Sequence, residues 1–535
     1  MNFTLGVLLS LSFVITVLGL FVFIWAQSNG LLKMGQSAAS VIFAEGEIGH
    51  AETFAGVSSD GGAGAGAGNH PDSAELQDRL LADRSSSAAA LAFIASSVGW
   101  LLLGSLFGML ASLNFQVPDW LSGSPLVTFG RTRIVHLNIV TYGWASMAGI
   151  GVALWLLPRL LKTQLVGARF AIAGAVLWNL GVAMGCAAIL FGWSDGLEWL
   201  EIPWQIGILL AIAGSLAAVP LLLTLRNRNV DHLYVSVWYL SAALLWFPIL
   251  YVVAKVPYVH FGVESAIVNW WFAHNVLGLW LTPLGLGTAY YLIAKIVGRP
   301  IYSYNLSLIG FWALAMFYSQ AGVHHLIGGP VPEWIVTVSI VQSVMMVVPV
   351  IAVAINHMMT LKGHGAILKE SYSLRFVALG SALYTLVSMQ GSLEAVRSFN
   401  RIVHFTQYTI GHAHLGVYGF YSLIMFGAIY FLMPRVAGRE WPFPKLIAWH
   451  FWLVVAGIGI YFLSLTIGGV LQGLAMLDPK QAFMASVNAT LPYLAARTVG
   501  GTLMTAGHCV FAYHFFKLLA MRADSRVVQA VTADA

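Results

Sequence analysis

The stretch RTRIVHLNIVTYGW, residues 131–144, decides the fold of this chain, because it carries two arginines and a histidine inside a long apolar run. That run, residues 127–158, is long enough to cross a bilayer as a helix, since about 20 apolar residues span the hydrocarbon core. Comparable runs recur along the whole chain, and they are continuous rather than alternating. Only helices and closed barrels satisfy the backbone in lipid, and continuous runs favour helices. We therefore predict an all-α, polytopic membrane helix bundle.

The composition supports a chain surrounded by membrane lipid. Of its 535 residues, 59% are hydrophobic and only 9% are charged, against about 25% charged residues in a typical soluble domain. The mean hydropathy is +0.80. These values exclude a cytosolic enzyme, a nucleic-acid-binding protein and a disordered protein. The two cysteines lie inside apolar runs, and the sequence has no CxxCH motif, so the chain cannot attach a c-type haem covalently.

The apolar runs predict about 12 core transmembrane helices and one extra N-terminal transmembrane helix. The extra helix, residues 3–25, lacks the basic segment and the cleavage site of a signal peptide, so we expect it to be retained. With its tail it occupies residues 1–50, and a flexible Gly/Ala-rich linker follows at 51–87. The core bundle takes residues 88–525, and residues 526–535 form a cytoplasmic tail. The core spans are expected at 88–113, 127–158, 167–192, 203–225, 233–254, 264–295, 305–327, 333–357, 372–393, 401–433, 444–476 and 488–517.

Charge in the loops predicts the orientation of the bundle. Basic residues gather in alternate loops, and the positive-inside rule makes those loops cytoplasmic. Both ends of a 12-span core bundle are then cytoplasmic, and the extra first helix has its N-terminus outside. The opposite set of loops carries an acidic stretch, Asp195, Glu198 and Glu201. The basic set comprises Arg159, Lys162, Arg226, Arg228, Lys295, Arg299, Lys362, Lys369, Arg375, Arg435, Arg439, Lys445, Lys517, Arg522 and Arg526.

Six histidines inside the spans predict metal chemistry, because ionisable residues within a membrane are functional by default. His412 and His414 are two residues apart, so they point about 200° apart on a helix and can ligate different haems. His136 can supply the second axial ligand of one haem, while the other haem keeps an open face. His274, His324 and His325 offer three imidazoles to one further metal, for which copper, zinc and iron are all suitable.

The order and spacing of these histidines resemble the catalytic subunit of haem–copper oxygen reductases, and finer motifs resemble the C family, the cbb-type cytochrome c oxidases. The resemblance covers residues 90–520. It implies that His136 and His414 ligate low-spin haem b, that His412 ligates high-spin haem b, and that His274, His324 and His325 bind copper. The motifs are FGRTRIVH (129–136), WWFAHN (270–275), YSYNLSLIGFWAL (302–314), HH (324–325), GHAH (411–414), WHFWL (449–453), VLQGL (470–474) and GGTLMTAGH (500–508).

The resemblance also implies a catalytic tyrosine. In the A family a tyrosine follows the first copper histidine by four residues, but here that position is Gly278. The C family supplies the tyrosine from the next helix, where Tyr318 stands, and bonds it covalently to the copper histidine, here His274. Glu394 matches a glutamate that the C family places beside high-spin haem, where it would orient the histidine ligand.

Further roles follow from the resemblance for polar residues near the two ends of the bundle. A single cytoplasmic proton path is implied through Ser307, Tyr290, Tyr291, Ser303 and Tyr304. Arg133 and His404 are placed to meet haem propionates, because guanidinium binds carboxylate bidentately. Glu198 and Glu201 are candidates for a propionate-linked calcium or for a solvated acidic loop. The sequence departs from the C-family pattern at Asn305, where arginine is usual, and at Gln407, where aspartate is usual.

The resemblance implies a terminal respiratory oxidase in a bacterial inner membrane. Its partners would be membrane-anchored c-type cytochrome subunits, with cytochrome c as electron donor, oxygen as substrate and proton translocation coupled to turnover.

The N-terminal run LFVFIWAQSNGLLKMGQSAASVIFAEGE (20–47) resembles the small maturation protein of cbb-type oxidases, and a plain anchor is the alternative. A nitric oxide reductase of the same superfamily is the nearest rival, although no glutamate follows His274 on its helix. A membrane transporter would explain the spans but not the six histidines.

Overall fold

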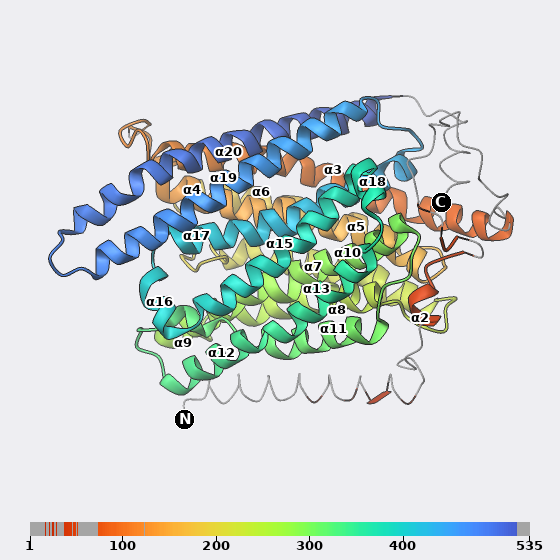
Figure 1. Ribbon diagram of the computed structural model, residues 1–535, viewed down its shortest axis with the longest axis horizontal. Coiled ribbons are helices and arrows are strands. Elements are labelled where there is room, and N and C mark those ends of the chain that lie inside the picture. Colours follow the sequence, from red (N-terminus) through yellow and green to blue (C-terminus); the bar gives the residue numbers. More distant parts are fainter. Residues whose placement is uncertain are drawn as a thin grey trace.

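The computed structural model describes residues 37–44, 47–49, 51, 73–121 and 123–521, with a few isolated positions before Ser37. Most of the expected N-terminal span, most of the Gly/Ala-rich stretch and the expected C-terminal tail lie outside the described residues. The described part is helical throughout and contains no strand, which confirms the all-α bundle (Figure 1). Eleven of its helical segments are long and apolar enough to cross a membrane.

The first eleven expected core spans coincide with these eleven segments to within a few residues, except that the first starts earlier and the tenth starts later than expected. The uninterrupted helices among them are α3 (Ser73–Leu113), α6 (Ala168–Leu190), α7 (Trp204–Arg226), α8 (Val235–Lys255), α15 (Tyr372–Glu394) and α19 (Pro444–Leu477). The α11 (Tyr304–Tyr318) segment ends in the 3-10 turn η4 (Val323–Leu326), and α12 (Glu333–Met345) continues into α13 (Val347–Leu361). Shorter elements are α2 (Ser37–Ser40), η1 (Pro125–Val127), α14 (Gly365–Glu370) and α16 (Arg397–Val403).

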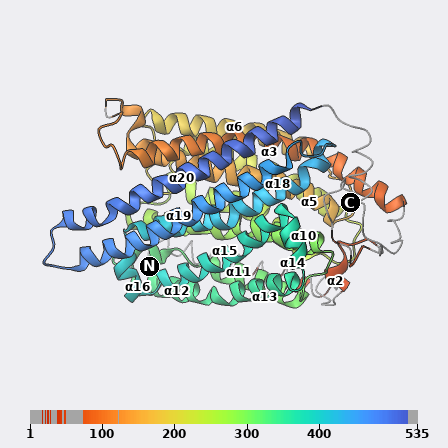
Figure 2. The same cartoon turned by 45° about the horizontal axis from the view of Figure 1, so that its top comes forward.

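The twelfth expected span differs from the others. It lies in α20 (Phe483–Ala520), a helix of 38 residues that packs along α19 (Figure 2). This helix is long enough to cross a bilayer but is not among the eleven apolar segments, because polar residues interrupt it from Arg497 to His508. Several of these side chains line the central cavity described below, which accounts for their presence in a helix of the bundle.

Three segments form the centre of the bundle. Their most apolar windows are 83–94% buried, whereas the other eight are 39–50% buried. Each contains a π-helical stretch, in which every backbone hydrogen bond spans one residue more than in an α-helix, a feature frequent at functional sites. The three are α4 (Phe129–Asn138), η2 (Ile139–Ala145) and α5 (Ser146–Leu160); α9 (Gly262–Asn275), η3 (Val276–Leu281) and α10 (Thr282–Val297); and α17 (Gln407–His414), η5 (Leu415–Ser422) and α18 (Leu423–Ala437).

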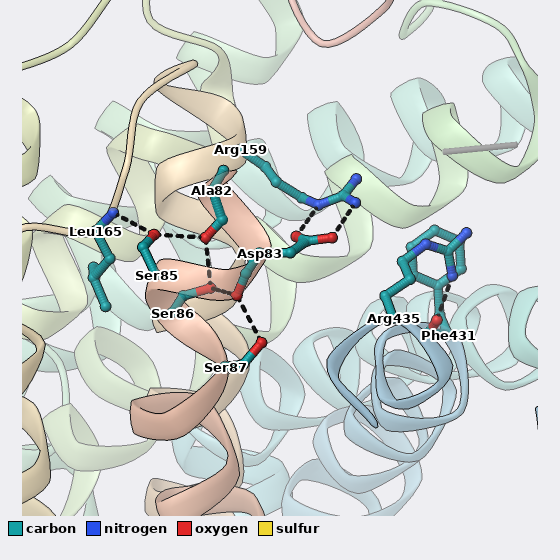
Figure 3. Close-up of polar contacts among 9 residues, drawn as sticks. All are labelled: Ala82, Asp83, Ser85, Ser86, Ser87, Arg159, Leu165, Phe431 and Arg435. Atoms are coloured by element: carbon teal, nitrogen blue, oxygen red, sulfur yellow. Dashed lines mark hydrogen bonds and ion pairs between the residues drawn. The ribbon is translucent and has the colours of Figure 1, made fainter. Parts of the chain in front are cut away.

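The linker expected to extend to residue 87 is helical from the start of α3, so its C-terminal part was predicted wrongly. A buried ion pair fixes this extension, since Asp83 accepts two hydrogen bonds from Arg159 at 2.6 and 2.7 Å (Figure 3). The Ser85 hydroxyl accepts a hydrogen bond from the backbone N–H of Leu165 at 2.8 Å. These contacts tie the first turns of α3 to α5 and to the loop that follows α5.

A short piece of the N-terminal segment also packs on the bundle, at the end where α10 terminates (Figure 2). Glu47 forms ion pairs with Lys295 of α10 and, at 2.9 Å, with Arg79 of α3. The backbone N–H of Gly49 donates to the carbonyl of Gly298 at 2.8 Å. The apolar side chains of this piece are buried in the main core: Ala38, Ala39, Ile42 and Phe43.

Candidate functional site

All six histidines singled out from the sequence line one central cavity of about 390 Å³. They come from the three central segments and from η4, so residues almost 280 positions apart meet around one space. Within this cavity the histidines form two groups. One group, His136, His412 and His414, lies between α4 and α17, and the other, a cluster of three, lies between α9 and η4.

His136 and His414 face each other as nearly parallel rings. Their centroids are 6.3 Å apart and the ring planes differ by 13°. The Nδ1 atom of His136 lies 2.7 Å from the carbonyl oxygen of Gly104, and that of His414 lies 2.9 Å from the carbonyl of Ile410. A carbonyl only accepts, so each Nδ1 carries a hydrogen and each Nε2 is left as the basic nitrogen.

This pair fits a haem iron with two axial imidazoles. Metal–nitrogen bonds of about 2 Å on both sides of one iron place the two ring centroids roughly 6 Å apart, close to the observed spacing. The backbone carbonyls hold the tautomer that ligation by Nε2 needs. Gly108 provides the space for one ring, because a Cβ at that position would lie 2.8 Å from the His136 imidazole.

His412 lies on the other side of α17 from His414, as the helical periodicity predicts. Its Nδ1 is 3.2 Å from the side-chain oxygen of Gln390, while the Glu394 carboxylate lies 3.9 Å from Nε2. Glu394 accepts a hydrogen bond from Thr409 at 2.7 Å. The group that orients Nδ1 of His412 is therefore Gln390, one helical turn before Glu394, and not the glutamate that the family resemblance implied.

His274, His324 and His325 form the second group. One ring nitrogen from each lies within 4.8 Å of the others, close to the spacing of about 3 to 4 Å for three nitrogens on a shared metal ion. Ser343 donates its hydroxyl hydrogen to the carbonyl of Ser339 at 2.8 Å, and its oxygen lies 2.9 Å from Nδ1 of His324, which also accepts from the backbone N–H of Gly322 at 3.4 Å. That leaves Nε2 of His324 for the metal.

Tyr318 fills a space that a glycine leaves beside His274. The ring centroids of Tyr318 and His274 are 4.5 Å apart. A Cβ at Gly278, one turn after His274, would lie 1.7 Å from the Tyr318 ring, so any larger residue at 278 would displace the tyrosine. The structure thus puts a phenol from α11 at the histidine cluster, in the space beside Gly278.

The end of the cavity near the start of α4 carries Arg133, predicted to meet a haem propionate, and Glu198, predicted as a calcium candidate. Arg133 donates to Glu198 at 2.7 Å, and both line the cavity. Glu201 lies behind them and accepts from Asn138 at 2.9 Å. Burial, and then the neighbouring Glu198 carboxylate, raise the pKa of Glu201 to about 7. His404 does not line the cavity; its ring stacks on Phe405 with 3.9 Å between centroids.

Arg497 is a further cavity residue that sequence reasoning missed. It is 8% exposed, and its Nε and Nη1 atoms have no hydrogen-bond partner among the described residues. Its guanidinium lies over the rings of Phe115 and Tyr461, at 5.0 and 5.7 Å. A buried guanidinium with unpartnered N–H groups fits a bound carboxylate such as a haem propionate. Its only signal in the sequence is an arginine inside α20.

The predicted proton-path residues gather where α10 ends and α11 begins. Ser303 caps α11, Ser307 donates to the carbonyl of Tyr304, and Tyr304 donates to the carbonyl of Leu233. Tyr290 and Tyr291 are both buried in the second half of α10. These five residues lie near one another at the end of α10 and the start of α11.

Two residues that were not predicted extend this polar region. The ring of His357 lies 4.3 Å from that of Tyr290, and its Nδ1 is 2.6 Å from the Ser381 hydroxyl. Tyr384 lines the cavity and lies close to both Tyr318 and Tyr290. The two residues therefore occupy the space between the loop at the end of α10 and the histidine cluster.

Comparison with known proteins identifies what shares this arrangement. Residues 88–503 match the family described as Cytochrome C and Quinol oxidase polypeptide I. The chain is 33% identical over 441 residues to the cbb3-type cytochrome c oxidase subunit CcoN1 of Stutzerimonas stutzeri, covering 79% of this chain and 93% of that protein. It is 31% identical to cytochrome c oxidase subunit 1 of Rhodobacter capsulatus, covering 79% and 83% of the two chains.

Two more distant similarities bear on the fold and on the rival function. A nitric oxide reductase polypeptide of Stutzerimonas stutzeri is 25% identical over 440 residues, covering 77% of this chain and 90% of the reductase. A cryo-EM structure of a haem–copper terminal oxidase dimer superposes with a TM-score of 0.68 at 16% identity, covering 82% of this chain and 85% of that one. The latter similarity supports the fold alone.

Proposed function

Because this chain belongs to the cytochrome c and quinol oxidase polypeptide I family, that is, to subunit I of the haem–copper oxidases, we propose that its cavity holds low-spin haem b, high-spin haem b and one copper ion. The chain is the catalytic subunit of a cbb3-type cytochrome c oxidase, a respiratory oxidoreductase of the membrane.

The observation that carries the assignment is the facing pair of His136 and His414 beside a separate cluster of three imidazoles. His136 and His414 would together hold one haem, whereas His412 alone would hold the other, and His274, His324 and His325 would hold the copper. The haems and copper, when bound, supply electron transfer and oxygen activation. The chain orients these groups through Gly104, Ile410, Gln390 and Ser343 and keeps its ligating nitrogens unprotonated.

This division of the histidines makes a spectroscopic prediction. His136→Ala or His414→Ala removes one axial ligand from a six-coordinate haem, so we expect loss of the low-spin b-type signal with copper retained. His412→Ala should instead affect the high-spin haem. The measurement is the reduced-minus-oxidised spectrum with the copper content of each purified variant. Replacement of His508, which also lines the cavity, by Gln is the matched control. Loss of the same signal in all three alanine variants would contradict the division.

We further propose the remaining roles of the site. Protons reach the cavity through Ser303, Tyr304, Ser307, Tyr290 and Tyr291, and His357 and Tyr384 continue this path toward Tyr318. Arg133 and Arg497 hold propionates. Glu198 and Glu201 are candidates for calcium, because hard cations prefer carboxylate oxygens.

We place the chain in a bacterial inner membrane, with the basic loops in the cytoplasm. Membrane-anchored cytochrome c subunits, which receive electrons from cytochrome c, lie on the other side.

Oxygen is favoured over nitric oxide as substrate by two features of the histidine cluster. The cation-binding group among the described residues consists of three histidines without a carboxylate, and non-haem iron favours a carboxylate beside imidazole. Tyr318 also packs directly on His274. The nitric oxide reductase is the more distant relative at 25% identity, against 33% for the oxidase subunit.

For the N-terminal extension we propose a tethered maturation segment that stays docked on the finished enzyme. Glu47 supports this, because it is shared by Lys295 and Arg79 on two different helices of the bundle. Burial alone would raise the pKa of Glu47, but Lys295 and Arg79 together lower it below its usual value. A carboxyl with a depressed pKa stabilises the folded state above its unfolded pKa, and this contribution is lost as the pH falls through the depressed value.

Glu47→Gln should therefore destabilise the docked segment at neutral pH. We expect a loss of about 1–3 kcal/mol, because the buried ion pair between Glu47 and Lys295 is removed. Thermal unfolding with the haem spectrum as probe measures the effect, and Glu370→Gln, on the exposed helix α14, is the control. Unchanged stability together with unchanged haem occupancy, both in Glu47→Gln and in a deletion of residues 1–50, would reduce the extension to a plain anchor.

A further inference from the structure

A loop with a strained tryptophan lies at the end of the cavity near the start of α4. Trp199, between α6 and α7, has a φ of +67° in the left-handed region. That conformation is uncommon for any residue except glycine and exceptional for a bulky one. Trp199 and its neighbour Glu198 both line the cavity. Such strain persists only where surrounding contacts maintain it, and it clusters at functional sites.

The peptide groups on both sides of Trp199 are bound by side chains of the central segments. Tyr142 of η2, which is 1% exposed, donates its hydroxyl hydrogen to the carbonyl of Trp199 at 2.5 Å. Asn269 of α9 donates to the carbonyl of Glu198 at 2.8 Å. A change in φ at Trp199 would break these contacts and leave buried polar groups unpaired, which costs free energy. The two hydrogen bonds therefore maintain the strained conformation.

The next two residues of the loop are held in a similar way. Lys255 of α8, which is 8% exposed, donates to the carbonyl of Leu200 and, at 2.6 Å, to the carboxylate of Asp195. Asn138 of α4 donates to the carboxylate of Glu201 at 2.9 Å. Four successive residues, 198–201, are thus fixed by side chains from α9, η2, α8 and α4. Most loops are mobile compared with the elements they connect, but this loop is tied to four segments of the bundle.

A second tryptophan between α6 and α7 shows what distinguishes Trp199. Trp193 is 50% exposed and is not among the described residues that line the cavity. Trp199 lines the cavity together with Arg133 and His136, and Arg133 is the proposed partner of a haem propionate. The indole of Trp199 therefore lies at the end of the cavity where propionates would be bound. An aromatic ring at that place excludes water, and solvent access controls the reduction potential of a bound haem.

We propose that residues 198–201 form a preorganised wall at the propionate end of the cavity, in which Tyr142 and the other three side-chain donors hold the Trp199 indole against the bound haems. Trp199 and Tyr142 are positioning residues: the indole keeps water from the haem edge, and the Tyr142 hydroxyl keeps the indole in place. Glycine at position 199 would remove the strain but would provide no ring. The inference rests on the proposed haem-binding function, because the wall acts on a haem that the cavity would hold.

The test measures the midpoint potential of each b-type haem and the melting temperature of the complete purified enzyme. Trp199→Ala and Trp199→Gly both remove the indole, so both should lower the potential of at least one haem, because water stabilises the more positively charged ferric state. Trp199→Gly should melt at a higher temperature than Trp199→Ala, because glycine adopts a positive φ without steric cost and alanine does not. Trp199→Phe keeps an aromatic ring and should retain most of the potential.

Trp193→Ala is the matched control, since it removes an exposed indole between the same two helices and should leave both potentials unchanged. Tyr142→Phe should lower the potential less than Trp199→Ala, because the indole remains while its carbonyl contact is lost; it also provides the test if Trp199→Ala fails to assemble. Potentials in Trp199→Ala and Trp199→Gly equal to those of Trp193→Ala would overturn the role of the indole. Equal melting temperatures for Trp199→Ala and Trp199→Gly would overturn the role of strain. Absence of b-type haem from the unmodified protein would refute the proposed function instead.

Discussion

A His274→Ala protein should lose its copper and its oxygen reduction while both haems remain visible. His274 supplies one of three imidazoles whose ring nitrogens lie within 4.8 Å of one another, and no neighbouring side chain in that group can replace it. Loss of an outer hydrogen-bond partner alone costs roughly 10–100-fold in metal affinity, so loss of a ligand should exceed about 100-fold. Copper analysis and oxygen consumption of the purified variant measure the effect.

Ser343→Ala should have a smaller effect on copper binding than His274→Ala. It removes the hydroxyl that is hydrogen-bonded to Nδ1 of His324 and leaves all three ligands in place. Copper affinity should therefore fall less than in His274→Ala, by roughly 10–100-fold. Full copper content and normal turnover in His274→Ala would show that the cluster of three histidines is not the metal site.

Tyr318→Phe should keep haems and copper and lose oxygen reduction by at least about 100-fold, the scale of a lost proton donor at a reacting centre. Breaking the O–O bond requires electrons and a proton together, and a phenol gives one of each as it becomes a neutral radical. Tyr318 is the tyrosine whose ring packs on His274, at 4.5 Å between centroids. The measurement is turnover at matched metal content.

A covalent bond between Tyr318 and His274 would explain how the phenol is held there. Its formation removes one hydrogen from each ring, as two electrons and two protons that oxygen, the substrate, accepts. Digestion of the native enzyme should then give the two peptides joined. Tyr384→Phe, in which a second cavity tyrosine loses its hydroxyl but Tyr318 is intact, should leave the joined peptides unchanged. Separate peptides with near-normal turnover in Tyr318→Phe would favour a nitric oxide reductase instead.

The grouping of the histidines was predictable from the sequence because it depends on helical periodicity. His412 and His414, two residues apart, must point to opposite sides of α17, and the structure shows this arrangement. The choice between Gln390 and Glu394 was not predictable in this way. They lie one turn apart on the same side of α15, and a small difference in how α15 and α17 pack decides which one reaches His412.

Other features depended on contacts between segments that no local pattern reveals. The need for glycine at position 278 is visible only in the structure, where the Tyr318 ring occupies the space of its side chain. Arg497 sits in a helix whose polar residues reduce its hydropathy, and only the packing of α20 shows that they face the cavity. The segment around Glu47 has no helical periodicity, and its docking depends on two cations from α3 and α10.

The haem and metal content of the purified enzyme, read together with its reduced-minus-oxidised spectrum, tests the central claim most directly. Three ligand groups around one cavity, His136 with His414, His412 alone, and His274 with His324 and His325, predict two b-type haems for each copper ion. They also predict that one haem binds carbon monoxide and the other does not. A single haem per chain, or iron in place of copper at the histidine cluster, would contradict the account.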